Sequence, residues 1–257
     1  MKNVFVGWGD IEQTIRKAGK ALLLFDFDGT LSQIERNPGD AQLDERLKPL
    51  LAKLLMIKNI TLGIVSGRAL FDIEKRVGLK NIIYAGNHGL EAHGNGIRFT
   101  HPRSESLRKN IEVIMREASQ GTRIRGLFIE NKGPTGSIHY RNVAPRELGR
   151  VLSLVNRIKP LCERKGFCFR QGKKVFDIIP ELKWGKGAFV QWLEKETGRP
   201  LVVYTGDDAT DEDVFRAMKK EGISIRVGEL KGSAASYYLQ SQRDMPALLK
   251  RLIDLWN

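Results

Sequence analysis

Cysteine and long hydrophobic runs are scarce in this chain of 257 residues. Its two cysteines, Cys162 and Cys168, are too few for a disulfide framework, and their spacing matches no zinc-binding motif. No apolar run approaches the roughly 20 residues that a membrane-spanning helix needs. Residues 1–20 contain acidic side chains and lack the apolar segment of a secretory signal. We therefore expect a cytoplasmic protein that makes no contact with a membrane.

The chain is strongly basic, but its basic residues are dispersed along the sequence. The chain has 43 basic and 30 acidic residues, a formal net charge of +13. Such a charge can attract nucleic acid or a small phosphorylated substrate. The basic residues form no run of five and are not interleaved with aromatic residues, as a groove for single-stranded nucleic acid would require. We expect no nucleic-acid partner, and a basic nucleic-acid-binding protein remains the non-enzyme alternative, testable by salt-dependent DNA binding.

Hydrophobic periodicity predicts that strands alternate with helices in the first and last parts of the chain. Continuous apolar runs are typical of buried strands, and apolar residues three and four positions apart are typical of helices. This alternation predicts an α/β fold with a doubly wound, Rossmann-like parallel sheet. The expected strands cover residues 21–25, 60–65, 82–85, 201–205 and 224–227, and the expected helices cover residues 43–58, 70–77, 187–197 and 211–221.

The middle of the chain has a different order. A predicted helix over residues 104–118 is followed by two strand-like runs, and a second over residues 145–165 is followed by two more. The order helix–strand–strand, found twice, predicts an α+β domain inserted into the α/β chain. We therefore expect a discontinuous core of residues 1–102 and 183–257 and an inserted domain of residues 103–182. The expected strands of the insert cover residues 126–131, 136–142, 167–171 and 174–179.

Two carboxylates follow the first predicted strand directly, in the segment Asp26-Phe27-Asp28-Gly29-Thr30. Open α/β sheets place their active sites at the carboxyl ends of strands. Asp26 is therefore a candidate nucleophile, and Asp28 a candidate general acid and base. Gly29 would let the backbone turn sharply and approach a ligand. A simple Asp-Gly turn, with Asp26 as a helix cap, is the structural alternative.

Three further segments lie at predicted strand ends or helix starts. Ser66 offers a hydroxyl and neighbouring N–H groups that could hold phosphate oxygens, although Ser-Gly also starts helices. Lys186 could neutralise phosphate charge, although many lysines are simply exposed. The segment 206–213 carries clustered carboxylates, which repel one another unless a cation neutralises them. Oxygen ligands favour Mg²⁺ there, although acidic residues also favour the first turn of a helix.

Four segments, in this order, resemble the four motifs of the haloacid dehalogenase superfamily of phosphotransferases. They are Asp26 to Thr30, Ser66, Lys186 and Gly206-Asp207-Asp208. The inserted α+β unit is similar to the second type of cap domain in that superfamily. More narrowly, the chain resembles the trehalose-6-phosphate phosphatases from about residue 20 to its end. The segments that carry this narrower resemblance are residues 66–68, 86–91, 130–132, 137–141 and 206–215.

The resemblance implies a phosphatase that uses Mg²⁺ and hydrolyses trehalose 6-phosphate through an aspartyl-phosphate. Asp26 would attack the phosphorus, and Asp28 would protonate the departing sugar hydroxyl and then activate water. Ser66 and Lys186 would hold the transferring phosphoryl group. The implied metal site consists of Asp26, the backbone carbonyl of Asp28, Asp207 and Asp208, with Asp211 in support.

The same resemblance implies residues that bind the substrate. In the family a glutamate, one methylene longer, commonly stands near the position of Asp177. For the substrate, sucrose phosphate, mannosyl-3-phosphoglycerate or a broad range of sugar phosphates stay open as alternatives. For the charged residues of the insert, the alternative is that they form only a solvated face of a hairpin. We expect a monomer that acts on a small sugar phosphate and works alongside a trehalose-6-phosphate synthase. The implied substrate-binding residues are Arg68, Asn87, His88, Glu130, Lys132, Ser137, His139, Arg141 and Asp177.

Overall fold

The computed structural model describes residues 1–35, 37–172, 174–218, 221–228 and 231–256, and the chain divides into two compact units. The second unit contains the whole of the predicted insert, residues 103–182. It also includes the short segment Glu35–Asp40, which the sequence had led us to assign to the core. The first unit consists of Met1–Ile34, Ala41–Phe99 and Trp184–Asn257, and the second of Glu35–Asp40 and Thr100–Lys183.

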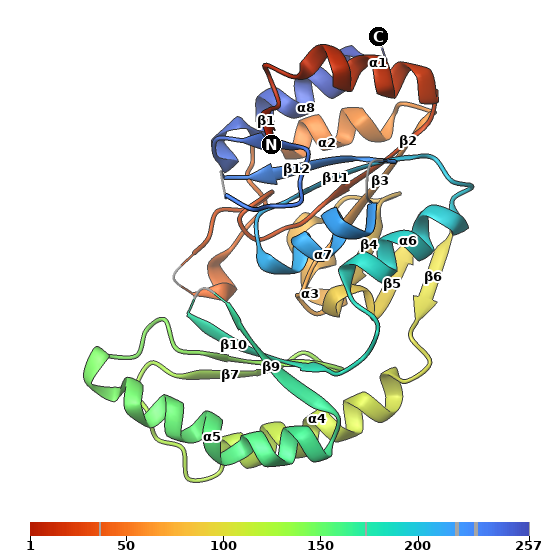
Figure 1. Ribbon diagram of the computed structural model, residues 1–257. Helices are drawn as coiled ribbons and strands as arrows, with labels where there is room; N and C mark the ends of the chain where they lie inside the picture. Colours follow the sequence, from red (N-terminus) through yellow and green to blue (C-terminus); the bar gives the residue numbers. More distant parts are fainter. Residues whose placement is uncertain (36, 173, 219–220, 229–230, 257) are drawn as a thin grey trace. The chain divides into compact units, whose positions relative to one another are not determined.

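A nine-stranded sheet in the order β1-β13-β12-β11-β2-β3-β4-β5-β6 forms the centre of the first unit (Figure 1). Along this order, every pair of neighbouring strands from β1 through β13, β12, β11, β2 and β3 to β4 is parallel. Strand β5 is antiparallel to β4. The predicted α/β class with a parallel-sheet core is therefore confirmed. The strands are β1 (Lys2–Asn3), β2 (Ala21–Phe25), β3 (Ile60–Val65), β4 (Ile83–Gly86), β5 (Glu91–Gly94), β6 (Ile97–Thr100), β11 (Leu201–Gly206), β12 (Ile223–Val227) and β13 (Tyr237–Leu239).

Helices cover both faces of this sheet. All five residues of β2 are buried; Leu23 and Phe25 enter one hydrophobic cluster, and Leu22 and Leu24 enter another. Because side chains alternate across a strand, β2 must be apolar throughout to face both clusters. Figure 1 shows α1 and α8 on the opposite side of the strands from α6 and α7. These helices are α1 (Trp8–Ala18), α6 (Lys186–Glu196), α7 (Ala209–Met218) and α8 (Met245–Asp254), together with α2 (Lys48–Leu55) and α3 (Leu70–Val77).

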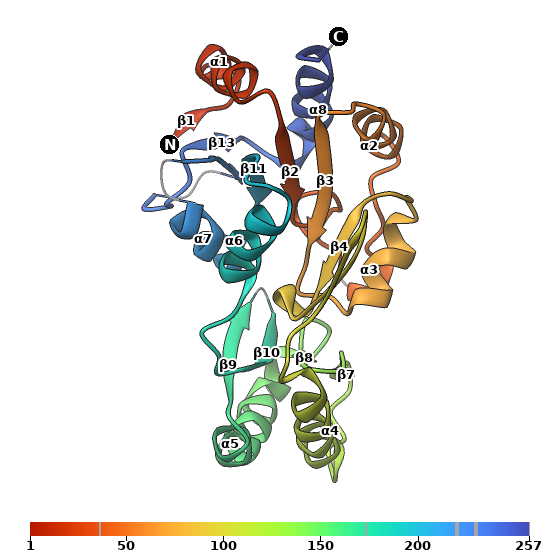
Figure 2. The same cartoon turned by 90° about the vertical axis from the view of Figure 1, so that its right-hand side faces the viewer.

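The second unit is an antiparallel sheet in the order β7-β8-β10-β9 with two helices along one face (Figure 2). Its pairing register puts Ile138, Phe167 and Ile178 on one face, and all three are buried. Ser137, His139 and Asp177 lie on the other face. The elements are α4 (Ser104–Ser119), β7 (Phe128–Asn131), β8 (Gly136–His139), the short helix η3 (Pro145–Glu147), α5 (Leu148–Arg164), β9 (Phe167–Gly172) and β10 (Val175–Pro180).

Some elements differ from the prediction. The helix expected over residues 43–58 begins only at Lys48, because Pro49 suits the first turn of a helix and Asp44 holds a turn before it. Strands β1, β5, β6 and β13 and helix α8 were not expected. The helix predicted over residues 211–221 corresponds to α7, Ala209–Met218. The predicted range also includes residues 219 and 220, which lie outside the described residues. No helix in the described part of the chain combines the length and the apolar character needed to cross a bilayer.

Candidate active site

Three buried side chains from separate elements meet at the carboxyl end of β2. Asp26 follows the strand directly, and its backbone N–H donates to the Thr205 carbonyl of β11 over 2.8 Å. Lys186 Nζ, at the start of α6, donates to Asp26 Oδ1 and to Asp211 Oδ1, both over 2.8 Å. The side chains of Lys186 and Asp26 are only 2% and 5% exposed. The residues predicted as nucleophile and phosphate-binding cation are thus in direct contact.

Asp211 organises the segment that follows β11. Its Oδ1 accepts a hydrogen bond of 2.7 Å from the Tyr204 hydroxyl, besides the bond from Lys186. Its Oδ2 accepts the backbone N–H groups of Asp207 and Asp208 over 2.8 and 2.9 Å. Both carboxylate oxygens are therefore fully used in holding neighbours, and Tyr204 is a partner that sequence reasoning missed.

The charges of this cluster do not balance. Burial raises the pKa of Asp26 well above its usual range, although Lys186 opposes the shift. Burial likewise raises the pKa of Asp211 to about 6. Burial alone would lower the pKa of Lys186, but Asp211 and Asp26 outweigh it and hold that pKa well above its usual value. Asp26, Asp207 and Asp211 are all buried near this one ammonium group, an arrangement that a further cation would stabilise.

Oxygen atoms suited to a metal ion gather beside Asp26. Carboxylate oxygens of Asp26, Asp207 and Asp211 lie within 4.8 Å of one another. The backbone at Gly29, with φ +86°, approaches the Asp207 carboxylate so closely that an added Cβ would lie 2.3 Å from Oδ2. The Asp207 carboxylate is therefore held against the turn that follows Asp28. A set of oxygen donors alone fits a hard divalent cation such as Mg²⁺.

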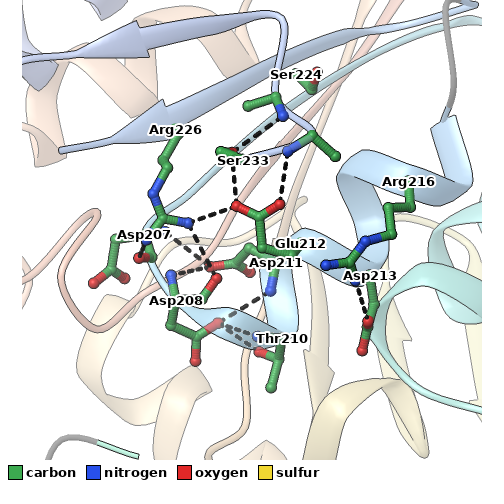
Figure 3. A network of polar contacts seen from close by, with 12 residues as sticks. Asp207, Asp208, Thr210, Asp211, Glu212, Asp213, Arg216, Ser224, Arg226 and Ser233 are labelled. Atoms are coloured by element: carbon green, nitrogen blue, oxygen red, sulfur yellow. Dashed lines mark hydrogen bonds and ion pairs between the residues drawn. The ribbon is translucent and has the colours of Figure 1, made fainter. Parts of the chain in front are cut away.

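Asp208 is oriented differently from its acidic neighbours (Figure 3). Its Oδ1 accepts the backbone N–H groups of Thr210 and Asp211 and the Thr210 hydroxyl, over 2.7, 3.0 and 2.7 Å. Burial alone would raise the pKa of Asp208, but Lys186 and the bonds from Thr210 lower it. This carboxylate caps the start of α7. Its assignment as a metal ligand stays a prediction.

The predicted general acid, Asp28, pairs with the predicted substrate residue Arg68. Arg68 Nε lies 2.7 Å from Asp28 Oδ2, and Nη2 lies 2.6 Å from Oδ1. Arg68 Nη1 also donates to Asp72 Oδ2 over 3.0 Å, and its guanidinium lies 5.5 Å from the Phe27 ring centre. The Asp28 side chain is 41% exposed, whereas Arg68 is buried. A bidentate pair of this kind fixes the orientation of the carboxylate.

The loops after β3 and β4 bring together the remaining predicted residues of the first unit. Ser66 Oγ accepts the Arg68 N–H over 3.1 Å, and the Ser66 carbonyl accepts the His88 N–H over 2.9 Å. His88 has a left-handed backbone with φ 58°, and an added Cβ on Gly67 would lie 2.6 Å from its ring. Asn87 is buried and donates from Nδ2 to Glu91 Oε2 over 3.1 Å. Ser66 and His88 are thus held side by side.

The second unit carries a polar network on the face of its sheet opposite the helices. Glu130, Ser137 and Asp177 are in register on β7, β8 and β10. Glu130 Oε2 lies 2.9 Å from His139 Nε2, and the Ser137 hydroxyl donates to Asp177 Oδ1. Lys132 Nζ lies 3.5 Å from Asp177 Oδ1 and 4.0 Å from Glu130 Oε2. Five of the six residues predicted in the insert therefore form one network, while Arg141 lies in the turn after β8.

The chain is similar to known proteins over most of its length. It matches the family model described as trehalose-phosphatase over residues 24–243. It is 34% identical over 246 residues to a trehalose-phosphate phosphatase of Mycobacterium ulcerans, covering 90% of this chain and 60% of that relative. It is 31% identical over 261 residues to probable trehalose-phosphate phosphatase D of Arabidopsis thaliana, covering 92% and 68%. The chain thus spans only 60% of the length of the mycobacterial relatives from M. ulcerans and M. marinum.

Solved structures show the same fold. The C-terminal domain of the C. albicans trehalose-6-phosphate phosphatase gives a TM-score of 0.79 at 22% identity, and the match covers 96% of each chain. A trehalose-6-phosphate phosphatase related protein gives a TM-score of 0.77 at 25% identity, covering 91% of this chain and 97% of that one.

Proposed function

The chain belongs to the trehalose-phosphatase family, and we propose that it hydrolyses trehalose 6-phosphate to trehalose and inorganic phosphate. The observation that carries this proposal is the buried contact of Lys186 with Asp26 at the carboxyl end of β2. A nucleophilic carboxylate beside a fixed cation is suited to phosphoryl transfer, which depends mainly on positioning and on neutralising charge. The substrate is proposed from the names of the relatives.

In the proposed reaction, a carboxylate oxygen of Asp26 attacks the phosphorus while the bond from phosphorus to the sugar oxygen breaks. Asp28 gives a proton to the departing sugar oxygen, and trehalose leaves. Asp28 then takes a proton from water, whose oxygen attacks the phosphorus and breaks the bond to Asp26. Lys186 and the Ser66 hydroxyl hold the phosphoryl oxygens through both steps. The guanidinium of Arg68 donates to both oxygens of Asp28 and so fixes the orientation of the carboxyl group to which we assign the proton transfers.

A magnesium ion is part of the proposal. Asp26, Asp207 and the Asp28 backbone carbonyl would hold it, and the bound ion would supply positive charge to the phosphoryl oxygens. The support is the close group of buried carboxylate oxygens and the packing of Asp207 against Gly29. Asp211 is assigned a different task, because its oxygens already hold Lys186, Tyr204 and two backbone N–H groups.

Recognition of the sugar is proposed for the polar network of the second unit. Its side chains include carboxylates, an ammonium group, a hydroxyl and an imidazole, which together offer the donors and acceptors that sugar hydroxyls need. Asp177, shorter than the usual glutamate, is supported by its contacts with Ser137 and Lys132. The proposed sugar-binding residues are Glu130, Lys132, Ser137, His139, Arg141 and Asp177, with Arg68, Asn87 and His88 from the first unit. The other sugar phosphates named above remain the competing substrates.

The test is phosphate release from trehalose 6-phosphate, with and without Mg²⁺, by the wild-type protein and by Asp26→Asn. Loss of the nucleophile should lower the rate by at least about 10⁴-fold. Asp10→Asn is the matched control, because Asp10 pairs only with Lys2 among the ion pairs of the described residues and both side chains are exposed. An Asp26→Asn protein that is folded and still releases phosphate at the control rate would contradict the proposed mechanism.

A further inference from the structure

Arg226 is a largely buried arginine whose guanidinium reaches the segment after β11 from the neighbouring strand β12 (Figure 3). Its Nη2 donates to the Asp207 backbone carbonyl over 2.5 Å. Its Nη1 donates to the Asp208 carbonyl over 3.4 Å and to Glu212 Oε1 over 2.8 Å. One side chain thus contacts two successive peptide carbonyls and a carboxylate. Arg226 was not identified from the sequence, and Glu212 was identified only as part of the acidic segment 206–213.

Glu212 extends this network beyond α7. Its Oε1 also accepts the Ser233 hydroxyl over 2.6 Å, and its Oε2 accepts the Ala234 backbone N–H over 2.8 Å. The ion pair between Arg226 and Glu212 is almost fully buried, with side chains 11% and 8% exposed. A buried pair with further hydrogen bonds holds its geometry closely, because breaking one contact leaves a charge without compensation.

The peptide groups of Asp207 and Asp208 are consequently held from two sides. Asp211 accepts both of their N–H groups, and Arg226 donates to both of their carbonyls. With the backbone fixed in this way, the Asp207 side chain is directed to the Gly29 turn, where its Oδ2 would lie 2.3 Å from an added Cβ. The contact of Arg226 with Asp207 is thus to its backbone carbonyl, next to the carboxylate that packs against Gly29.

We propose that Arg226 is a positioning residue that aims the Asp207 carboxylate at the divalent cation. Its fork of N–H donors does what a single ammonium group cannot, because a lysine has no planar pair of donors to span two carbonyls and a carboxylate. The positive charge of Arg226 also balances the carboxylate of Glu212. Replacing Arg226 by lysine keeps this charge but removes the planar set of donors, so the effect of charge can be separated from the effect of geometry. Partners that orient metal ligands typically contribute about 10- to 100-fold to metal affinity.

The inference rests on the metal site of the proposed function, and binding of Mn²⁺ alone tests the two separately. Affinity is measured by the water-proton relaxation of Mn²⁺ for the wild type, Asp207→Asn, Arg226→Lys and Arg226→Met, with unfolding followed by circular dichroism. We expect one saturable site in the wild type that Asp207→Asn removes, and about 10- to 100-fold weaker binding in both Arg226 variants. No saturable site in the wild type would overturn the metal site and the inference together.

Arg157→Gln is the matched control. Arg157 makes the same kinds of contact in the second unit, to Glu117 Oε1 and to the carbonyls of Glu117 and Gln120. Its removal should leave Mn²⁺ affinity unchanged. Wild-type affinity in folded Arg226→Lys would show that charge alone matters, and wild-type affinity in folded Arg226→Met would show that the contact is irrelevant; either result overturns the inference while the metal site stands. Should Arg226→Met fail to fold, Arg226→Lys, which keeps the buried charge, still decides between geometry and charge.

Discussion

Replacing Gly29 by alanine tests the packing of the turn after Asp28 against Asp207. The added methyl would lie 2.3 Å from Asp207 Oδ2 and 2.5 Å from its carboxyl carbon. Contacts of a real Cβ hardly fall below 3.0 Å, so the Asp207 carboxylate has to move by about 0.7 Å, the difference between the two distances. Because a misplacement of about 1 Å can cost on the order of 10²-fold in rate, we expect kcat/KM for phosphate release to fall by about that factor.

Gly19→Ala separates this effect from backbone strain. Gly19 also has a left-handed backbone, with φ +68°, and among the described residues no atom beyond its own chain neighbours lies within 4 Å of its added Cβ. Left-handed geometry costs a residue with a side chain about 1–2 kcal/mol, so urea denaturation should show a loss of that size in Gly19→Ala and of at least that size in Gly29→Ala, where the clash with Asp207 adds to it. Only Gly29→Ala should lose activity. If a folded Gly29→Ala protein keeps the same kcat/KM as Gly19→Ala, the proposed role of the contact is refuted.

Two further predictions concern stability. Tyr204→Phe removes the 2.7 Å hydrogen bond to the buried Asp211 carboxylate, so the free energy of unfolding should fall by about 1–3 kcal/mol in urea denaturation; no change would contradict the buried network. The hydrogen bond from Arg46 lowers the pKa of Asp44 from 3.8 to about 2, so the folded state favours the ionised carboxylate. The resulting stabilisation is present above pH 4 and lost as the pH falls toward 2. Since Arg46 is exposed, we expect about 1 kcal/mol. The difference in unfolding free energy between wild type and Asp44→Asn should therefore shrink over that range, and a constant difference would contradict the assignment.

The parts of the fold that could be predicted are those whose buried residues form a recognisable pattern within a short segment of the sequence. Strand β2 faces two clusters at once and is apolar throughout, so its sequence alone identifies it. Strands β5 and β6 are adjacent in both the chain and the sheet, and Asn95-Gly96 between them is a local hairpin signal that we did not use. Strand β13 has three residues and pairs with β1 near the start of the chain, a partner that local patterns do not reveal. Helix α8 did carry a usable signal, because Pro246 lies in its first turn and buried residues recur along one face.

The candidate site divides in the same way. Asp26 and Lys186 could be predicted to meet because strand ends and helix starts converge at one edge of an α/β sheet. The pairing of Arg68 with Asp28 could not be predicted, because the two residues are 40 positions apart and the sequence around either one does not indicate the other as its partner. Arg226 is harder still to identify, since a single arginine in the strand Ile223–Val227, which also contains Ser224, shows no pattern that distinguishes a largely buried side chain from an exposed one.

The central claim is that this chain removes phosphate from trehalose 6-phosphate, and the most direct test is a comparison of kcat/KM among sugar phosphates in the presence of Mg²⁺. Trehalose 6-phosphate is measured beside glucose 6-phosphate, sucrose 6-phosphate and mannosyl-3-phosphoglycerate. We predict a strong preference for trehalose 6-phosphate that disappears when Mg²⁺ is removed. Equal values for all four compounds, or a preference for another of them, would contradict the claim.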